Sequence, residues 1–135
     1  MINTKNNKIL QKINRKTIRK DEKKMRTVYI LNNEFMGHGD DELGHKLMGA
    51  FLKKVWIRKE KPHAIIFYNS AVKLLAEGSM YLDALNGLQD AGVDLIACGT
   101  CIDFYGLSDT IKVGRVSGME EIVDITQQVE SVVTI

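Results

Sequence analysis

The sequence has little of what marks several classes of protein. Two cysteines in the chain are too few for the disulfide framework of a small secreted domain. No apolar run approaches the roughly 20 residues that a membrane helix needs. The N-terminus is basic but lacks the short apolar core and small-residue cleavage site of a secretory signal. We therefore expect a cytoplasmic protein that has no membrane span.

Positive charge is scarce beyond the first 26 residues. Residues 1–26 hold ten Lys or Arg against two Asp or Glu, whereas residues 27–135 hold nine against fifteen. The basic segment has no aromatic side chain on which a nucleic-acid base would stack. We predict that residues 1–26 are a basic N-terminal extension or linker remnant, that residues 27–135 form one domain, and that nucleic acid is not a partner.

Strand and helix signals alternate along residues 27–135. Short β-branched and aromatic runs predict strands at 27–32, 63–68, 93–97, 111–116 and 131–135. Apolar residues at helical spacing predict helices at about 41–56, 79–91 and 119–129, with a short helical turn or loop at 72–75. This alternation predicts an α/β fold: a mainly parallel sheet of about five strands with helices on both faces.

Local signals give the starts and the buried face of the helices. The first helix is expected to begin near Asp40 or Asp41, where acidic side chains oppose the helix dipole. Ser79 is expected to cap the second helix. The buried stripe of the first helix is predicted to consist of Leu43, Leu47, Phe51 and Val55, with their neighbours Met48 and Leu52.

The two cysteines form a C-x-x-C pair directly after the third predicted strand. Ligands of open α/β sheets gather at the carboxyl ends of the strands. Gly99 allows a sharp turn there. If residues 99–105 are helical, the unpaired N–H groups at the helix start, which includes the predicted anion-binding residues Gly99 and Thr100, would stabilise a thiolate at Cys98, the form that attacks sulfur. Cys101, one helical turn on, would resolve a mixed disulfide or receive the transferred sulfur.

Polar residues of two other loops are expected at the same edge. Asn69, Ser70 and Lys73 follow the second predicted strand and would orient or charge-stabilise a group bound near Cys98. Capping and surface roles are the alternative for these three. His38 would be an electrostatic partner of the thiolate, or simply an exposed loop residue.

Three other interpretations of the cysteine pair remain open. A zinc site would have to recruit His38, His45 and His63 from distant loops, so we expect no metal or other cofactor. In a thioredoxin-like enzyme the pair would follow an early strand and face a proline, whereas here it comes late and Pro62 precedes a strand. The cysteines would otherwise simply pack at the strand end.

Four segments of the sequence resemble a known family. They are FMGHGDDELGHKLMGAFL, IIFYNSAVKLLAEGS, GVDLIACGTCIDFYGL and VGRVSGMEEIV, in this order. With these segments, residues 27–135 resemble the DsrE-like family of sulfur-relay proteins. The resemblance is strongest to the carboxyl-terminal domain of YedF-type selenium-metabolism proteins. Ala71 stands where the family usually has glycine, and Gly118 where it usually has asparagine.

The resemblance implies a flavodoxin-like fold and homo-oligomers, trimers or hexamers. It also implies a persulfide on the cysteine at the position of Cys98, with Cys101 as a second sulfur or selenium ligand. The basic head stands where YedF-type proteins have a TusA-like domain, so a separate TusA-like carrier or a cysteine desulfurase is the expected partner. Apolar residues near the loops, Phe35, Met36 and Tyr105, are expected to be exposed for assembly.

We therefore expect a sulfurtransferase or a sulfur or selenium carrier that holds a persulfide on Cys98 and relays it to a partner protein. The alternative is a non-catalytic module that binds and regulates sulfur-relay partners, with the acidic domain and the basic head as docking surfaces.

Overall fold

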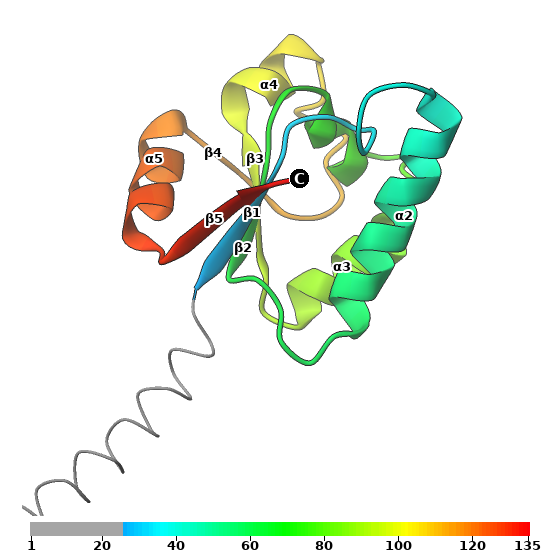
Figure 1. Cartoon of the computed structure of the whole chain (residues 1–135). Helices are drawn as coiled ribbons and strands as arrows, with labels where there is room; N and C mark the ends of the chain where they lie inside the picture. Colours follow the sequence, from blue (N-terminus) through cyan, green and yellow to red (C-terminus); the bar gives the residue numbers. More distant parts are fainter. Residues whose placement is uncertain (1–25) are drawn as a thin grey trace, which may run out of the picture.

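The computed structural model describes residues 26–135, and the predicted extension lies outside this range except for Arg26. Figure 1 shows the order of the elements. They are β1 (Thr27–Leu31), α2 (Asp41–Ile57), β2 (Ala64–Phe67), the 3₁₀ helix η1 (Asn69–Leu75), α3 (Leu82–Asp90), β3 (Asp94–Cys98), α4 (Gly99–Phe104), β4 (Arg115–Ser117), α5 (Met119–Gln128) and β5 (Ser131–Thr134).

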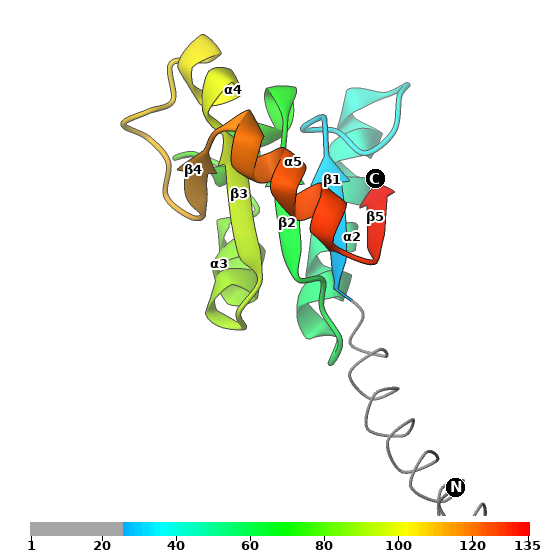
Figure 2. The same ribbon diagram turned by 90° about the vertical axis from the view of Figure 1, so that its left-hand side faces the viewer.

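The five strands form one sheet in the order β4-β3-β2-β1-β5. Every neighbouring pair is parallel. Helices α2 and α3 cover one face and α5 covers the other (Figures 1 and 2). The predicted three-layer α/β/α, flavodoxin-like fold is confirmed, and the carboxyl ends of β1, β2 and β3 meet at one edge of the sheet.

The core has one layer on each side of the sheet. The larger layer packs Leu31, Phe67 and Leu95 of the sheet against Met48 and Leu52 of α2, and it extends to α3 and η1. The smaller layer contains side chains under α5, and its fully buried members are Val28, Ala64, Ile66, Ile96, Cys98 and Ile122. Every residue of β2 is buried, as expected for a central strand covered on both faces.

The predicted buried stripe of α2 is confirmed for Met48, Leu52 and Val55 and is wrong for Leu43 and Leu47. Leu43 is 54% exposed and Leu47 is 43% exposed, whereas Gly44, Met48, Leu52 and Val55 are buried. The reason is Gly44, which packs closely on the preceding loop: a Cβ at this position would lie 2.7 Å from Cβ of Phe35. The predicted start is confirmed, because Asp40 caps the helix by accepting the N–H of Leu43 at 2.9 Å.

Two other element boundaries differ from the prediction. Helix α3 begins at Leu82 rather than at Ser79, because the Ser79 hydroxyl accepts the N–H of Tyr81 in the turn before the helix. Strand β4 contains only Arg115–Ser117. Ile111 instead forms an isolated antiparallel bridge with Ala76. Gly114, with φ 80°, turns the chain between Ile111 and the start of β4.

Arg115 ties the short strand β4 to its surroundings. Its guanidinium donates to both carboxylate oxygens of Asp94 on β3 at 2.9 Å, and to Glu121 of α5 at 2.6 and 3.2 Å. Ser117 also donates to Glu121. The hydrogen bonds from Arg115, and next those from Ser117, hold the pKa of the Glu121 carboxyl below its usual range.

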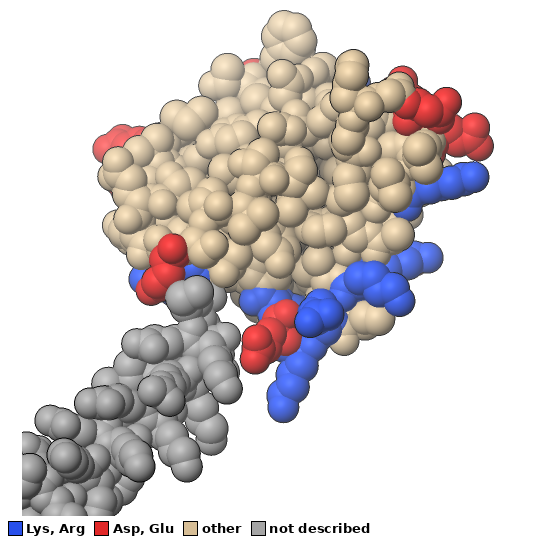
Figure 3. Space-filling model, viewed as in Figure 1, with Lys and Arg blue, Asp and Glu red and all other residues tan. Residues whose placement is uncertain are grey.

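The molecule has a face that is poor in charge. Figure 3 shows charged side chains mainly around the periphery of the view in which β5 lies in front. Val132 and Val133 of this edge strand are exposed. None of the helices in residues 26–135 combines the length and apolarity needed to cross a bilayer.

Candidate functional site at the dithiol edge

The cysteines lie where β3 runs into α4. Cys98 is the last residue of β3 and the N-cap of α4, and its side chain makes no capping hydrogen bond. It is 3% exposed and belongs to the core layer under α5. Cys98, which we expected to carry an accessible thiolate at the start of the next helix, is therefore enclosed, because the last β3 side chain faces the sheet layer that α5 covers.

Cys101 is the more accessible thiol. It is half-buried, packs against both core layers and accepts the backbone N–H of Asn69 at 3.1 Å. Burial raises the pKa of the Cys101 thiol, the Asn69 N–H opposes this change by lowering it, and a hydrogen bond with Cys98 raises it further. The two thiols are thus direct neighbours, and the amide donor acts on the second of them.

Asn69 has an unusual backbone conformation. Its φ is 50°, and it is the only non-glycine residue with positive φ in residues 26–135. Asparagine tolerates the left-handed region better than most residues. Its side-chain oxygen accepts the hydroxyl of Tyr105 at 2.7 Å. The predicted residue Asn69 therefore reaches the site through its main chain, and it contacts Cys101 rather than Cys98.

Lys73 contacts no sulfur atom. Its ammonium lies 3.4 Å from a carboxylate oxygen of Glu34 and 4.6 Å from the ring centroid of Tyr105. A cation over an aromatic face is attracted by the ring quadrupole. Lys73 therefore supports Tyr105, which in turn contacts Asn69.

Ser70 joins two of the three loops. Its hydroxyl donates to the side-chain oxygen of Asn33 at 3.0 Å and accepts the N–H of Glu34 at 3.1 Å. This pair of bonds fastens the loop after β1 to the start of η1. Ser70 thus holds the edge together and does not contact the thiols.

The remaining predicted site residues form no hydrogen bond with either sulfur. Gly99 packs against β4, where an added Cβ would lie 3.4 Å from the carbonyl oxygen of Ser117. Thr100 is exposed. His38 is exposed between two glycines of positive φ, and with the rest of residues 26–135 it forms no hydrogen bond, ion pair or ring contact. Across that same range no three His, Cys, Asp or Glu side chains converge as metal ligands would.

The comparison with known proteins agrees with this fold. The sequence profile of the DsrE/DsrF-like family matches residues 25–135. The chain belongs to the DsrE/DsrF-like family. Membership indicates a general role in sulfur relay, and DsrE/DsrF-like proteins often form oligomers and work with other sulfur-relay proteins.

Solved structures resemble this DsrE/DsrF-like chain in fold. The YchN protein of E. coli superposes with a TM-score of 0.58 at 20% identity, over 82% of this chain and 100% of that one. MTH1491 of Methanobacterium thermoautotrophicum, a protein of unknown function, gives 0.61 at 21%, over 82% and 99%. BT1422 of Bacteroides thetaiotaomicron gives 0.54 at 18%, over 81% and 94%. No curated protein matches the chain.

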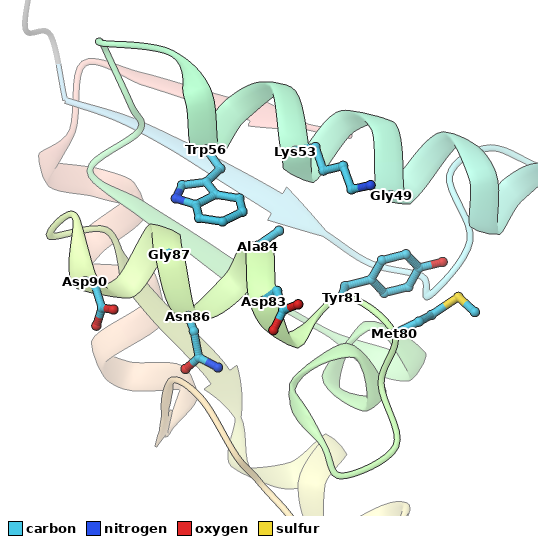
Figure 4. Close-up of a pocket in the computed structure, with 10 residues that line it drawn as sticks. All are labelled: Gly49, Lys53, Trp56, Met80, Tyr81, Asp83, Ala84, Asn86, Gly87 and Asp90. Atoms are coloured by element: carbon cyan, nitrogen blue, oxygen red, sulfur yellow. The ribbon is translucent and has the colours of Figure 1, made fainter.

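The DsrE/DsrF-like domain also has a groove between α2 and α3, shown in Figure 4. It contains neither cysteine. Trp56 of α2 lies across Gly87 of α3 so closely that a Cβ on Gly87 would be 2.1 Å from the indole. The groove is a helix-packing feature of the face that carries α2 and α3, separate from the dithiol edge.

Two aromatic residues of the edge were not predicted as site residues. Tyr105 was expected only as an exposed apolar residue, yet it is half-buried and bonded to Asn69. Burial, followed by the nearby Cys98 and Cys101, raises the pKa of the Tyr68 phenol. The spacing of four residues between Cys101 and Tyr105 puts both on one side of a helical turn, and this signal was present in the sequence. Phe35 and Met36, also expected to be exposed, are half-buried as well.

Proposed function

We propose that this DsrE/DsrF-like protein is a cytoplasmic carrier that relays sulfane sulfur through its two thiols to a partner protein. The observation that carries the proposal is the contact between Cys98 and Cys101 at the carboxyl edge of the sheet, with a backbone amide directed at the half-buried sulfur. A thiol pair of this kind suits transfer of a sulfur atom from one residue to the next.

Two steps describe the relay. The Cys101 thiolate attacks the outer sulfur of a donor persulfide, R–S–SH; the donor's S–S bond breaks, and its sulfur leaves with the electron pair and takes a proton. The Cys98 thiolate then attacks the outer sulfur of the Cys101 persulfide, which moves the sulfane sulfur to Cys98 and regenerates the Cys101 thiolate. No oxidant is consumed. The aliphatic side chains of the smaller core layer surround Cys98 and shield the persulfide stored there from water.

Mass spectrometry after incubation with a cysteine desulfurase and cysteine tests this order. The wild-type chain gains one sulfur atom that a reducing thiol removes. Cys101→Ser gains none, whereas Cys98→Ser gains one that is lost faster, because it stays on the more exposed residue. The double variant is the control. Undiminished loading of Cys101→Ser would overturn Cys101 as the entry point, and loading of the double variant would overturn the dithiol as the carrier.

The proposal extends to selenium as cargo and to a TusA-like carrier as the exchange partner, on the resemblance to YedF-type proteins. Loading the chain with sulfane sulfur and mixing it with a TusA-like protein tests the partner. Label appears on the TusA-like cysteine if the two exchange. An unrelated small thiol protein of similar exposure is the control, and equal labelling of both would contradict a specific partner.

We also propose that the protein is a homo-oligomer, trimeric or hexameric. The charge-poor face around β5 and the 82% exposed Phe104 on α4 support this, because large exposed apolar groups commonly mark interfaces. Light scattering tests it, and a monomer at micromolar concentration would contradict it.

A non-catalytic binding module is the second candidate, and the burial of Cys98 among hydrocarbon side chains favours it. In that role both cysteines pack and the partner binds elsewhere. Cys98→Ala and Cys101→Ala then leave complex formation with sulfur-relay proteins unchanged in a pull-down, and the wild-type chain takes up no sulfur.

A further inference from the structure

The half-buried thiol is connected to three loops by a chain of contacts. Asn69 donates its backbone N–H to the Cys101 sulfur at 3.1 Å, and Tyr105 donates its hydroxyl to the Asn69 side chain at 2.7 Å. Lys73 lies over the Tyr105 ring and pairs with Glu34. Tyr105 is therefore held from two sides, by its hydroxyl and by its ring.

These contacts hold the backbone of Asn69 in an unusual conformation. With φ 50°, the residue occupies the left-handed region, which is unfavourable for most L-amino acids, and such a conformation persists where surrounding contacts fix it. The N–H that points at Cys101 depends on this conformation. The hydroxyl of Tyr105 is the contact that fastens the side chain of Asn69, so it opposes relaxation of the backbone.

We propose that Tyr105 is a positioning residue, which keeps the Asn69 N–H directed at the Cys101 sulfur and so makes Cys101 the thiol that reacts with an incoming sulfur donor. The inference rests on the proposed relay for its biological meaning, but not for its geometry. Tyr105 touches neither reacting sulfur in the proposed steps and acts only through Asn69.

The surroundings of Cys101 define what the test must separate. Cys98 faces it from β3, Tyr68 from the end of β2 and Asn69 from η1, while Lys73 and Glu34 are one contact further away behind Tyr105. The phenylalanine variant of Tyr105 removes one hydroxyl and leaves the ring for Lys73. It changes no charge near the sulfur, so a change in thiol reactivity reports the orientation of the amide.

The experiment measures alkylation of Cys101 by iodoacetamide as a function of pH, in a Cys98→Ser background where it is the one remaining thiol. A hydrogen bond to a charged group is strong enough that weakening it lowers the thiolate population about tenfold. Tyr105→Phe should therefore react about tenfold more slowly at neutral pH, with the whole pH–rate profile displaced to higher pH and the limiting rate at high pH unchanged.

Two further variants make the result specific. Asn69→Gly adopts positive φ freely but has no side chain to fasten, so it should slow alkylation similarly, and adding Tyr105→Phe to it should cause no further loss. Tyr81→Phe is the matched control, because it removes a hydroxyl that donates to the carbonyl of His45 at 2.9 Å, outside the chain of contacts. It should leave the profile in place.

Superimposable profiles for Tyr105→Phe and its parent would overturn the inference. So would an equal displacement in Tyr81→Phe, or additive losses in the double variant. Alkylation requires no persulfide, so the two proposals fail separately. If the wild-type chain takes up no sulfur but Tyr105→Phe displaces the pH–rate profile, only the relay is contradicted. If the wild-type chain takes up sulfur normally but Tyr105→Phe leaves the profile unchanged, only the positioning role is contradicted.

Discussion

Replacing Gly44 by alanine should destabilise the protein even though alanine is the better helix former. Gly44 lies inside α2, where alanine gains about 1 kcal/mol over glycine. The added Cβ would meet Cβ of Phe35 at 2.7 Å and its Cα at 3.4 Å. These atoms are at or next to the main chain and cannot swing aside, so overpacking costs about 1–3 kcal/mol, and the steepness of this contact places it at the upper end. We expect a net loss of about 1–2 kcal/mol.

Gly49 in the same helix is the matched control. A Cβ there would lie 3.1 Å from the ring atom Cε1 of Tyr81, and a ring edge can yield by a few tenths of an ångström. Both variants gain the same helix propensity, so their difference isolates the contact with the main chain near Phe35. Gly49→Ala should fall between neutral and about 1 kcal/mol more stable.

Urea unfolding followed by circular dichroism measures both variants. Equal midpoints for Gly44→Ala and Gly49→Ala would refute the reasoning, since they would mean that the loop before α2 yields freely. That loop carries Glu34, the partner of Lys73. Gly44→Ala should therefore also slow the alkylation of Cys101, whereas Gly49→Ala should not.

Three other predictions follow from the fold. Arg115 lowers the pKa of Glu121 in the folded protein. The ionised carboxylate therefore stabilises the folded state at pH values above the pKa that Glu121 has in the unfolded chain, and this contribution is lost as pH falls through the lower pKa of the folded state. Glu121→Gln should flatten the acid side of a plot of Tm against pH, and an unchanged curve would contradict this. Ile66→Ala, at a fully buried position, should lower the free energy of unfolding by about 2–5 kcal/mol. Ile57→Ala, at an exposed position, should change it by less than about 0.5 kcal/mol. Equal effects of the two variants in urea unfolding would contradict the burial of Ile66 in the core. Val133→Lys on β5 should reduce the oligomer seen by light scattering without lowering Tm, and an unchanged particle mass would remove β5 from the interface.

The fold was predictable because its determinants are local. The apolar run of β2 already shows a strand buried on both sides, and the spacing of strand and helix signals sets a parallel sheet. Gly44 shows where this reasoning fails. A residue with no side chain gives no hydrophobic signal, yet its close approach to Phe35 rotates the helix and leaves Leu43 and Leu47 exposed.

The candidate site was predictable in place but not in detail. The cysteine pair and Asn69 do meet at the carboxyl edge of the sheet, as the strand order requires. Which cysteine is buried depends on which face the last residue of β3 points to. Because β3 is apolar throughout after Asp94, no alternation of polar and apolar residues reveals that face. The left-handed backbone of Asn69 and the bond from Tyr105 are tertiary features that no local pattern encodes.

The pairing of β5 with β1 has a consequence for synthesis of the chain. Strands β1, β2 and β3 pair with one another in the order in which they are synthesised. The other edge of β1 stays unpaired until β5, about a hundred residues further on, has been made. During translation the nascent sheet therefore presents the open, largely apolar edge of β1 until β5 has been made. A molecular chaperone that binds extended apolar segments would be needed mostly in this interval, and the demand ends once β5 closes the rim.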